Sequence, residues 1–196
     1  MDKKIIQPAY NFPPEVVLQE KKIIVGVTGG IAAYKAASLV RALRKCGATV
    51  KVIMTQHATD LITPLTMSTL SANKVYLDEF TDSENGEVVH IELAKWADGI
   101  VIAPATANTI AKIANGLADN LLTSVILATT APVVLAPAMN GQMWTNAMTQ
   151  ANIKKLEKYW YKIVPPVNGD LACGDDGMGA LAPTKDIVVG LKEVFE

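Results

Sequence analysis

The side chains best suited to chemistry in this sequence are His90, Asn140 and Cys173. A histidine titrates in the range that acid–base work needs, and an asparagine amide both donates and accepts hydrogen bonds. Cys173 stands in a glycine-rich segment with no core to fill, which favours redox chemistry, proton transfer or metal binding. The common alternative for an isolated histidine is a structural role. One such cysteine and two distant histidines give no metal-ligand spacing, so we expect no metal site.

Asn140 follows an apolar run, residues 132–136, which is rich in β-branched side chains and typical of a strand buried on both faces. Pro137 ends the run because proline has no N–H to donate to a neighbouring strand. Open α/β sheets bind their ligands in loops at the carboxyl ends of strands. We therefore interpret the loop that contains Asn140 as the floor of an active site.

A second polar loop follows the predicted strand Gly99–Pro104 and contains Thr106, Asn108 and Thr109. Threonine and asparagine commonly cap helices, and a helix is expected at 110–115. One cap needs one such residue, whereas three are present. Because both polar loops follow neighbouring strands, we expect them to line opposite sides of one flat, hydrogen-bonding ligand.

A glycine turn, Gly29-Gly30, separates an apolar strand at 22–28 from a helix at 31–46. A strand at 48–54 completes a β–α–β unit, which predicts a parallel sheet. The sequence therefore predicts a three-layer α/β/α fold with a Rossmann-like (flavodoxin-like) sheet.

The glycine turn also places backbone N–H groups at the start of a helix, which is a natural seat for a phosphate. Thr55, directly after the second strand, is placed to add a hydroxyl. The alternative is a tight corner without a ligand, because glycine permits such turns anywhere. The turn is not the dinucleotide-binding fingerprint, since Ala33 and Tyr34 stand where that motif has glycine.

Cys173 lies in a stretch rich in glycine and aspartate, residues 168–181, which we expect to form a mobile flap without a stable element. His90 is expected at the start of a short helix, and His57 on the surface. Thr184 is expected to cap the last helix. The remaining pattern predicts a broken helix at 56–73, short strands at 74–77 and 162–164, and a helical region at 141–160.

Composition bounds the class of protein. The chain has 196 residues, 50% of them hydrophobic, which suits one globular domain, predicted at 21–196 after an arm at 1–20 that is loose or packs on a neighbouring subunit. A net charge of −1 without a basic stripe argues against nucleic acid and anionic membranes as partners.

Two cysteines and no signal-peptide pattern favour a reducing compartment, the cytoplasm. Residues 121–139 carry no charge, but their prolines and threonines favour a buried helix and strand over a membrane span.

From about Lys22 to Glu196 the chain resembles the homo-oligomeric, flavin-containing cysteine decarboxylases. Five short motifs that occur in order carry the resemblance. They are Gly29-Gly30-Ile31-Ala32-Ala33-Tyr34-Lys35, His90-Ile91-Glu92-Leu93, Pro104 to Thr109, Pro137-Ala138-Met139-Asn140 with Met143-Trp144, and Ala172-Cys173-Gly174.

The resemblance implies FMN as the cofactor. The implied phosphate contacts are Gly29, Gly30, Ile31 and Thr55, and those of the flavin ring are Thr106, Ala107, Asn108 and Thr109, with Ala138 close by. The implied substrate contacts are Asn140, Met143, Ala172, Cys173 and Gly174. Members of the family are trimers or dodecamers built of trimers, with FMN at the subunit boundary. His90 is then expected to reach the flavin of an adjacent subunit.

Within the family, the chain is most similar to the members that decarboxylate 4′-phosphopantothenoylcysteine to 4′-phosphopantetheine in coenzyme A biosynthesis. The resemblance implies oxidation of the substrate thiol to a thioaldehyde with FMN as the oxidant, loss of CO₂ to leave an ene-thiol, and its reduction to the product. Asn140 would hold the carboxylate, and His90 would act in the oxidation as a base or by placing the thiol. Cys173 would donate the proton that the final reduction needs.

Two alternatives remain open. Peptidyl-cysteine decarboxylases of the lantibiotic type lack the Ala-Cys-Gly motif and release the ene-thiol, and other relatives are non-catalytic regulatory subunits that inhibit a phosphatase. The presence of Cys173 favours the small-molecule enzyme over the first, and the presence of all three candidate catalytic residues favours an enzyme over the second. Flavin prenyltransferases share the fold but lack the Pro-Ala-Met-Asn and Ala-Cys-Gly motifs. Gly30 departs from the family pattern, which often has serine there, so one phosphate hydrogen bond is in doubt.

Overall fold

The computed structural model describes residues 18–79, 88–170, 174 and 176–196. The strands are β1 (Lys22–Val27), β2 (Thr49–Met54), β3 (Val75–Tyr76), β4 (Gly99–Ala105), β5 (Val133–Pro137), β6 (Lys162–Ile163), β7 (Val167–Asp170) and β8 (Asp176–Ala180). The helices are the 3₁₀ helix η1 (Ile31–Lys35) and the α-helices α1 (Ala36–Lys45), α2 (Gln56–Thr59), α3 (Pro64–Ser71), α4 (Val89–Trp96), α5 (Ala107–Ala114), α6 (Leu121–Ala128), α7 (Gly141–Thr145), α8 (Ala147–Lys158) and α9 (Thr184–Glu193).

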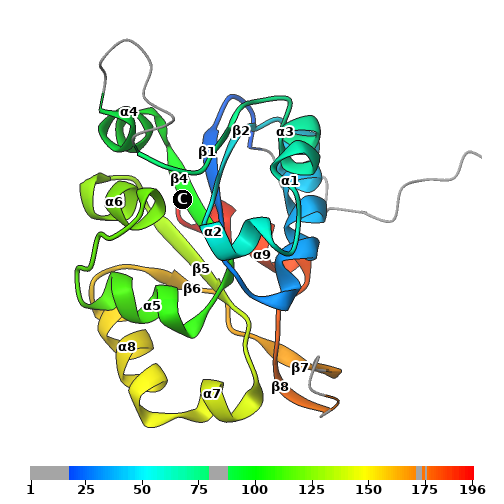
Figure 1. Cartoon of the computed structure of the whole chain (residues 1–196), viewed down its shortest axis with the longest axis vertical. Coiled ribbons are helices and arrows are strands. Elements are labelled where there is room, and N and C mark those ends of the chain that lie inside the picture. Colours follow the sequence, from blue (N-terminus) through cyan, green and yellow to red (C-terminus); the bar gives the residue numbers. More distant parts are fainter. Residues whose placement is uncertain (1–17, 80–87, 171–173, 175) are drawn as a thin grey trace, which may run out of the picture.

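The central sheet has six strands in the order β3-β2-β1-β4-β5-β6, and every neighbouring pair is parallel. Strands β4 and β5 are buried at every position, as expected where helices cover both faces of a parallel sheet. Figure 1 shows the two helical layers on either side of this sheet. The structure confirms the predicted three-layer, Rossmann-like fold.

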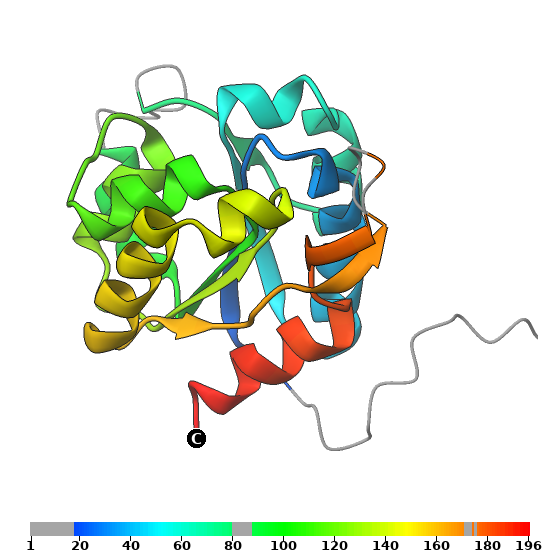
Figure 2. The same cartoon turned by 90° about the horizontal axis from the view of Figure 1, so that it is seen from below.

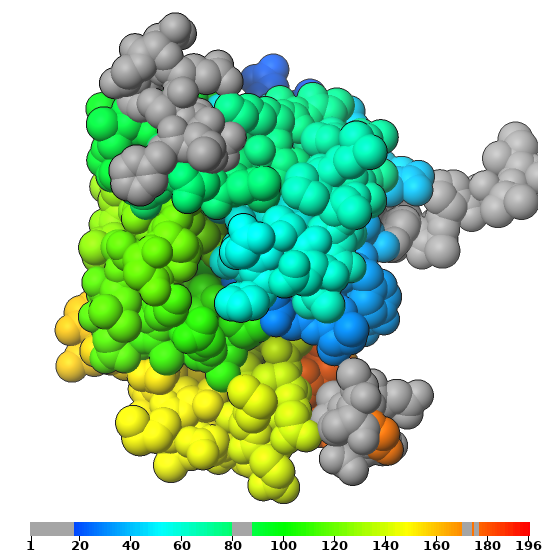
Figure 3. All heavy atoms as spheres, in the orientation of Figure 1, coloured from blue at the N-terminus to red at the C-terminus, as the bar shows by residue number. Residues whose placement is uncertain are grey.

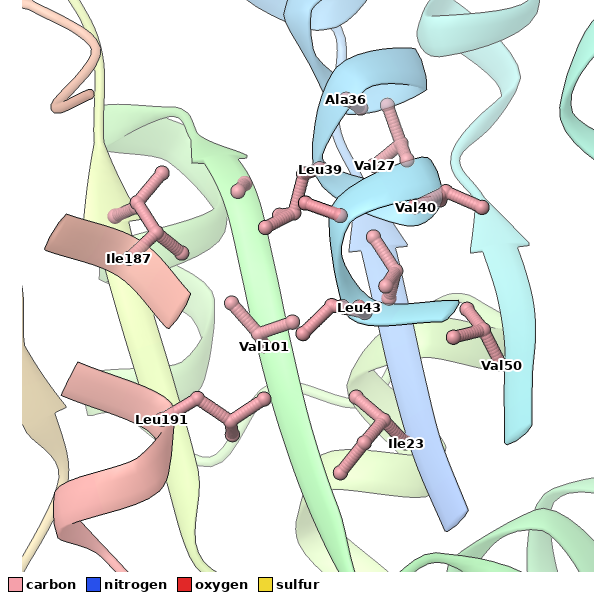
Figure 4. Packing of buried hydrophobic residues seen from close by; sticks show 14 of the residues in the cluster. Ile23, Val27, Ala36, Leu39, Val40, Leu43, Val50, Val101, Ile187 and Leu191 are labelled. Carbon is pink, nitrogen blue, oxygen red and sulfur yellow. The ribbon is translucent and has the colours of Figure 1, made fainter. Parts of the chain in front are cut away.

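Each face of the sheet has its own hydrophobic core. On one face, Leu39 and Leu43 of α1 and Ile187 and Leu191 of α9 cover the sheet around Val101 (Figure 4). The other face is covered by α4, α5, α6 and α8, whose buried side chains form a second cluster. Figure 2 shows the same layers from below. The two cores hold the sheet rigid, so that its carboxyl edge can position a site.

The chain reverses direction across the sheet between β1 and β4. After β1 it builds β2 and β3 on one side, and it then returns to place β4, β5 and β6 on the other. The loops after β1 and β4 therefore leave in opposite directions and open a crevice, which is where doubly wound sheets bind ligands.

Most predicted elements are present, with shifted boundaries. The helix predicted at 31–46 begins as the 3₁₀ helix η1 before it continues as α1. The broken helix is α2 and α3, with Pro64 in the first turn of α3, and the short strands are β3 and β6. The uncharged stretch 121–139 forms α6 and β5, and none of the described helices has the length and apolar character to span a membrane. Leu18, inside the predicted arm, is buried at 2% exposure and donates its N–H to Cys46 O.

The prediction of a flap without a stable element was wrong for the described residues. Strands β7 and β8 pair antiparallel with an irregular register between Val167 and Asn168. The pairing satisfies the backbone even though the side chains are small or polar, because an antiparallel ladder needs no hydrophobic run. The prediction that Thr184 caps α9 was also wrong, since Pro183 occupies the N-cap position and Thr184 is the first helical residue.

Candidate functional site

A cavity of about 600 Å³ opens at the carboxyl ends of β1, β4 and β5. This volume lies within the range of small-molecule sites, about 300–1,000 Å³. The lining residues are Gly29, Gly30, Ile31, Ala32, Tyr34, Lys35, Thr106, Ala107, Ala138, Met139, Asn140, Met143, Gly179, Ala180 and Leu181. The structure thus brings the glycine turn and both polar loops to one place, as the sequence predicted.

The glycine turn lies between α2 and the loop after β4. A Cβ on Gly29 would overlap the Cβ of His57 and lie 3.1 Å from its carbonyl carbon, so this position admits only glycine. A Cβ on Gly30 would have its nearest neighbour, Thr106 Cγ2, at 3.4 Å, which is ordinary contact. Ile31 begins η1, and the first N–H groups of a helix have no acceptor within it. The Gly30 N–H donates to Thr28 O at 2.8 Å, so the backbone donors beside the cavity are those of the first residues of η1.

Thr28, which the sequence analysis did not single out, joins the two sides of the crevice. Its hydroxyl donates to Pro104 O at 2.6 Å and accepts from the backbone N–H of Thr106 at 3.1 Å. The side chain is 1% exposed. One buried hydroxyl therefore fixes the loop after β4 against the end of β1. The signal that could have revealed it is a polar residue at the end of an apolar strand.

The polar loop after β4 both caps a helix and lines the cavity, the two roles that the sequence left open. Thr106 is the N-cap of α5, and its Oγ1 accepts from the Thr109 N–H at 3.3 Å and donates to Thr109 Oγ1 at 3.1 Å. Thr106 also lines the cavity, whereas Thr109 is buried at 5% exposure and Asn108 is exposed, both outside the lining. Capping thus accounts for two of the three polar residues.

Asn140 is held in a defined orientation at the floor of the cavity. Its Oδ1 accepts from the Gln142 N–H at 2.9 Å, which makes it the N-cap of α7. The preceding residue is fixed by the hairpin, because Met139 N–H donates to Gly179 O at 3.0 Å. Gly179 has a φ of +151°, and a Cβ there would overlap Met139 O. Glycine at this position is what allows β8 to dock against the loop.

Several predicted site residues do not line the cavity. Thr55 is the N-cap of α2 and is half-buried beside the end of β1. His90 lies on α4, and Figures 1 and 3 show α4 at the opposite end of the molecule from α7, β7 and β8. Gly174 is exposed, with a φ of +87°. Ala172 and Cys173 lie outside the described residues.

The cavity also has residues that the sequence analysis did not assign to the site. Lys35 carries the only formal charge among the described residues of the lining, and its Nζ lies 6.0 Å from the centre of the Tyr34 ring. The side chains of Ile31, Tyr34 and Met143 are 61%, 59% and 49% exposed, which gives the cavity an apolar rim. Lys35 stands within the glycine-turn motif, which is the signal that could have identified it.

Cys46 is buried in the core, an environment that disfavours thiol reactivity. It is 8% exposed at the end of α1 within the core. Burial raises the pKa of its thiol, which disfavours the thiolate that chemistry requires. Cys46 is therefore a core residue.

The model of the family described as Flavoprotein matches residues 12–196, and the chain belongs to this family. A probable phosphopantothenoylcysteine decarboxylase of Streptococcus mutans is 47% identical over 175 residues, covering 88% of this chain and 98% of that protein. The coenzyme A biosynthesis bifunctional protein CoaBC of Borreliella burgdorferi is 48% identical over 170 residues. That match covers 87% of this chain and 43% of the bifunctional protein, so the chain spans less than half of it.

Among solved structures, the fold is similar to a cysteine-to-serine mutant of a PPC decarboxylase complexed with pantothenoylaminoethenethiol. The TM-score is 0.81 at 34% identity, over 90% of this chain and 99% of that one. The likeness therefore extends over nearly all of both chains.

Proposed function

We propose that this chain binds FMN in the cavity and decarboxylates 4′-phosphopantothenoylcysteine. The observation that carries the proposal is the meeting of the glycine turn and Asn140 in one cavity at the reversal point of the sheet. Membership of the Flavoprotein family and the near-complete match to the Streptococcus mutans protein support it.

The residues present fit FMN. The N–H groups of the first residues of η1 suit a phosphate, and Lys35 adds a positive charge to the same wall. Thr106, Ala107 and Ala138 are small, so a flat ring can lie against their loops without displacing them. When bound, FMN supplies two-electron oxidation of a thiol, which no side chain of this chain can provide.

Asn140 positions the substrate carboxylate in this proposal. The Gln142 N–H already engages its oxygen, which sets the direction of its amide NH₂, a group that donates to carboxylates. A carboxylate held there leaves as CO₂ once the neighbouring carbon bears a C=S electron sink. Met143, half exposed on the rim, offers an apolar contact to the rest of the substrate.

His90 is supplied by a second copy of the chain. Within one copy α4 is far from the cavity, so its imidazole cannot serve that site (Figure 1). Val88 and Ile91 beside it are 56% and 37% exposed, and the cavity rim is also apolar. Pairing these two surfaces between copies buries both and brings an imidazole to the substrate thiol, whose proton it accepts. The assembly in this proposal is a homotrimer or a dodecamer of trimers.

Cys173 completes the reaction as the proton donor to the ene-thiol. Its support is the sequence alone, because it lies outside the described residues. Strand β8, which follows it in the chain, docks beside the cavity, where Gly179 O accepts from the Met139 N–H.

The test is an absorbance spectrum of the purified protein before and after 4′-phosphopantothenoylcysteine is added, with mass analysis of the product. A yellow protein whose product is lighter by CO₂ alone is the expected result. Loss of CO₂ with two further hydrogens would replace the final step with peptidyl-type, ene-thiol chemistry. A colourless protein that cannot be reconstituted with FMN would overturn the proposal and favour a regulatory role.

A further inference from the structure

We infer that Glu79 is a positioning residue for His90, holding the imidazole with its proton on Nδ1 and leaving Nε2 to accept the substrate proton. The inference rests on the proposed function, because it deepens the role given there to His90. It concerns a contact on the face of the molecule remote from the cavity of the same chain.

The two residues approach one another from different elements. Glu79 follows β3, and His90 is the second residue of α4. The distance from Glu79 Oε2 to His90 Nδ1 is 3.3 Å, and the two side chains are 24% and 27% exposed. Partial burial on both sides shields the contact from solvent more than an ion pair on an open surface.

The Nδ1 atom itself is buried, and among the described residues it has no partner with full hydrogen-bond geometry. Glu79 satisfies the distance but not the angle, so the carboxylate lies out of line with the ring nitrogen. Buried polar atoms in native proteins are nearly always hydrogen-bonded. In the described part of the chain, the Glu79 carboxylate lies within reach of this atom, and we expect it to rotate and accept the Nδ1 proton.

The chemical consequence concerns the tautomer of the imidazole. A neutral imidazole has one N–H donor and one acceptor, and the hydrogen bond made by one nitrogen decides the state of the other. A carboxylate can only accept, so it selects the tautomer with the proton on Nδ1. Nδ1 is buried while the side chain as a whole is 27% exposed, and the tautomer with the proton on Nδ1 makes Nε2 the acceptor toward a neighbouring copy.

The first experiment reads the tautomer directly, with no substrate present. The chain contains two histidines, so ¹⁵N-labelled histidine gives two ring systems, assigned with the His90→Asn variant. At neutral pH we expect a protonated Nδ1 and an unprotonated Nε2 for His90. In Glu79→Ala this pattern should move toward that of the exposed His57, which serves as the internal reference. An unchanged pattern would overturn the inference.

The second experiment separates positioning from a general loss of structure. Glu79→Ala should slow flavin reduction in a single turnover about 10–100-fold, with little change in KM, since a positioned base contributes about 10²–10⁴-fold. The control is Asp119→Ala, which removes a carboxylate paired with Lys112 at 2.6 Å on the loop between α5 and α6. The control should reduce flavin at the wild-type rate.

A double variant completes the test. In the His90→Asn background, Glu79→Ala should cause no further loss, because residues that act as a unit are not additive. A further loss of the same size would show that Glu79 acts without His90 and would overturn the inference. Full activity of His90→Asn alone would instead show that His90 is not the base assigned in the proposed function. The ¹⁵N spectrum would then still test whether Glu79 sets the tautomer of His90.

Discussion

The two sides of the cavity are built in different ways. On the side after β1, the first residues of η1 offer backbone N–H groups, and the nearest obstacle to a side chain on Gly29 is the Cβ of His57 in α2. On the side after β4 and β5, Thr106 and Asn140 offer side-chain groups whose positions are set by helix caps. A ligand on the first side contacts backbone groups, which do not depend on residue type. On the second side it contacts side-chain groups, which do.

This difference predicts opposite responses to substitution. On the backbone side, an added atom should do harm where it overlaps a neighbour, as at Gly29, and should be tolerated where it has room, as at Gly30. On the side-chain side, changing a functional group should abolish activity while the cap preserves the fold. The substitutions below at Asn140, Gly29 and Gly30 test this contrast.

The largest effect is expected for Asn140→Asp. Aspartate caps helices as well as asparagine does, so the free energy of unfolding should change by less than about 0.5 kcal/mol. Its charge would face the substrate carboxylate, and we expect a loss of kcat/KM of about 100-fold or more. Urea denaturation and steady-state kinetics measure the two quantities. Unchanged kinetics would remove Asn140 from carboxylate binding.

The same variant also tests the shared site. Asn140→Asp and His90→Asn should each be nearly inactive, and mixing them under conditions that exchange subunits should restore part of the activity. Recovery requires one intact cavity to receive one intact imidazole from another copy. If the mixture stays as inactive as its components, His90 does not act across a subunit boundary.

A smaller effect is expected for Gly29→Ala. The added methyl group would overlap His57 Cβ, and relief requires α2 to move. Overpacking of this kind costs about 1–3 kcal/mol, and the displaced turn should also bind FMN more weakly. Gly30→Ala is the matched control, since its methyl group has room and Gly30 already has extended backbone angles. Equal losses in both variants would contradict the close approach at Gly29.

The smallest effect is a gain, expected for Gly30→Ser. The Cβ fits, and the hydroxyl adds a donor where the resemblance places the FMN phosphate. A hydrogen bond of about 1.4 kcal/mol would tighten the FMN Kd about tenfold. Fluorescence titration of the apoprotein measures it, with Gly30→Ala as the reference for the methylene alone. Weaker binding than Gly30→Ala would place the phosphate elsewhere.

The sequence was sufficient for the fold and for most of the cavity. Apolar runs, the glycine turn and the prolines after 99–103 and 132–136 define parallel strands and the loops at their carboxyl ends. That is why the loops that contain Thr106 and Asn140 were expected to lie side by side, and both of these residues line one cavity. Each prediction used a local pattern whose partner was the next strand in the sheet.

The sequence analysis did not predict features that depend on residues far apart in the chain. The buried Thr28 hydroxyl bonds to residues 76 and 78 positions away, and no local pattern marks that bond. The hairpin was missed because its ladder depends on backbone pairing rather than on side-chain alternation. Glu79 was not singled out in the sequence, since only folding brings its carboxylate to His90.

The bond between Met139 N–H and Gly179 O makes two distant segments one cooperative unit. Local unfolding in proteins occurs in such units, whose parts open together. If the hairpin leaves the body of the protein, the Met139 amide loses its acceptor, and the loop that orients Asn140 loses its support. Solvent exchange of that single amide hydrogen therefore reports on the integrity of the whole cavity floor.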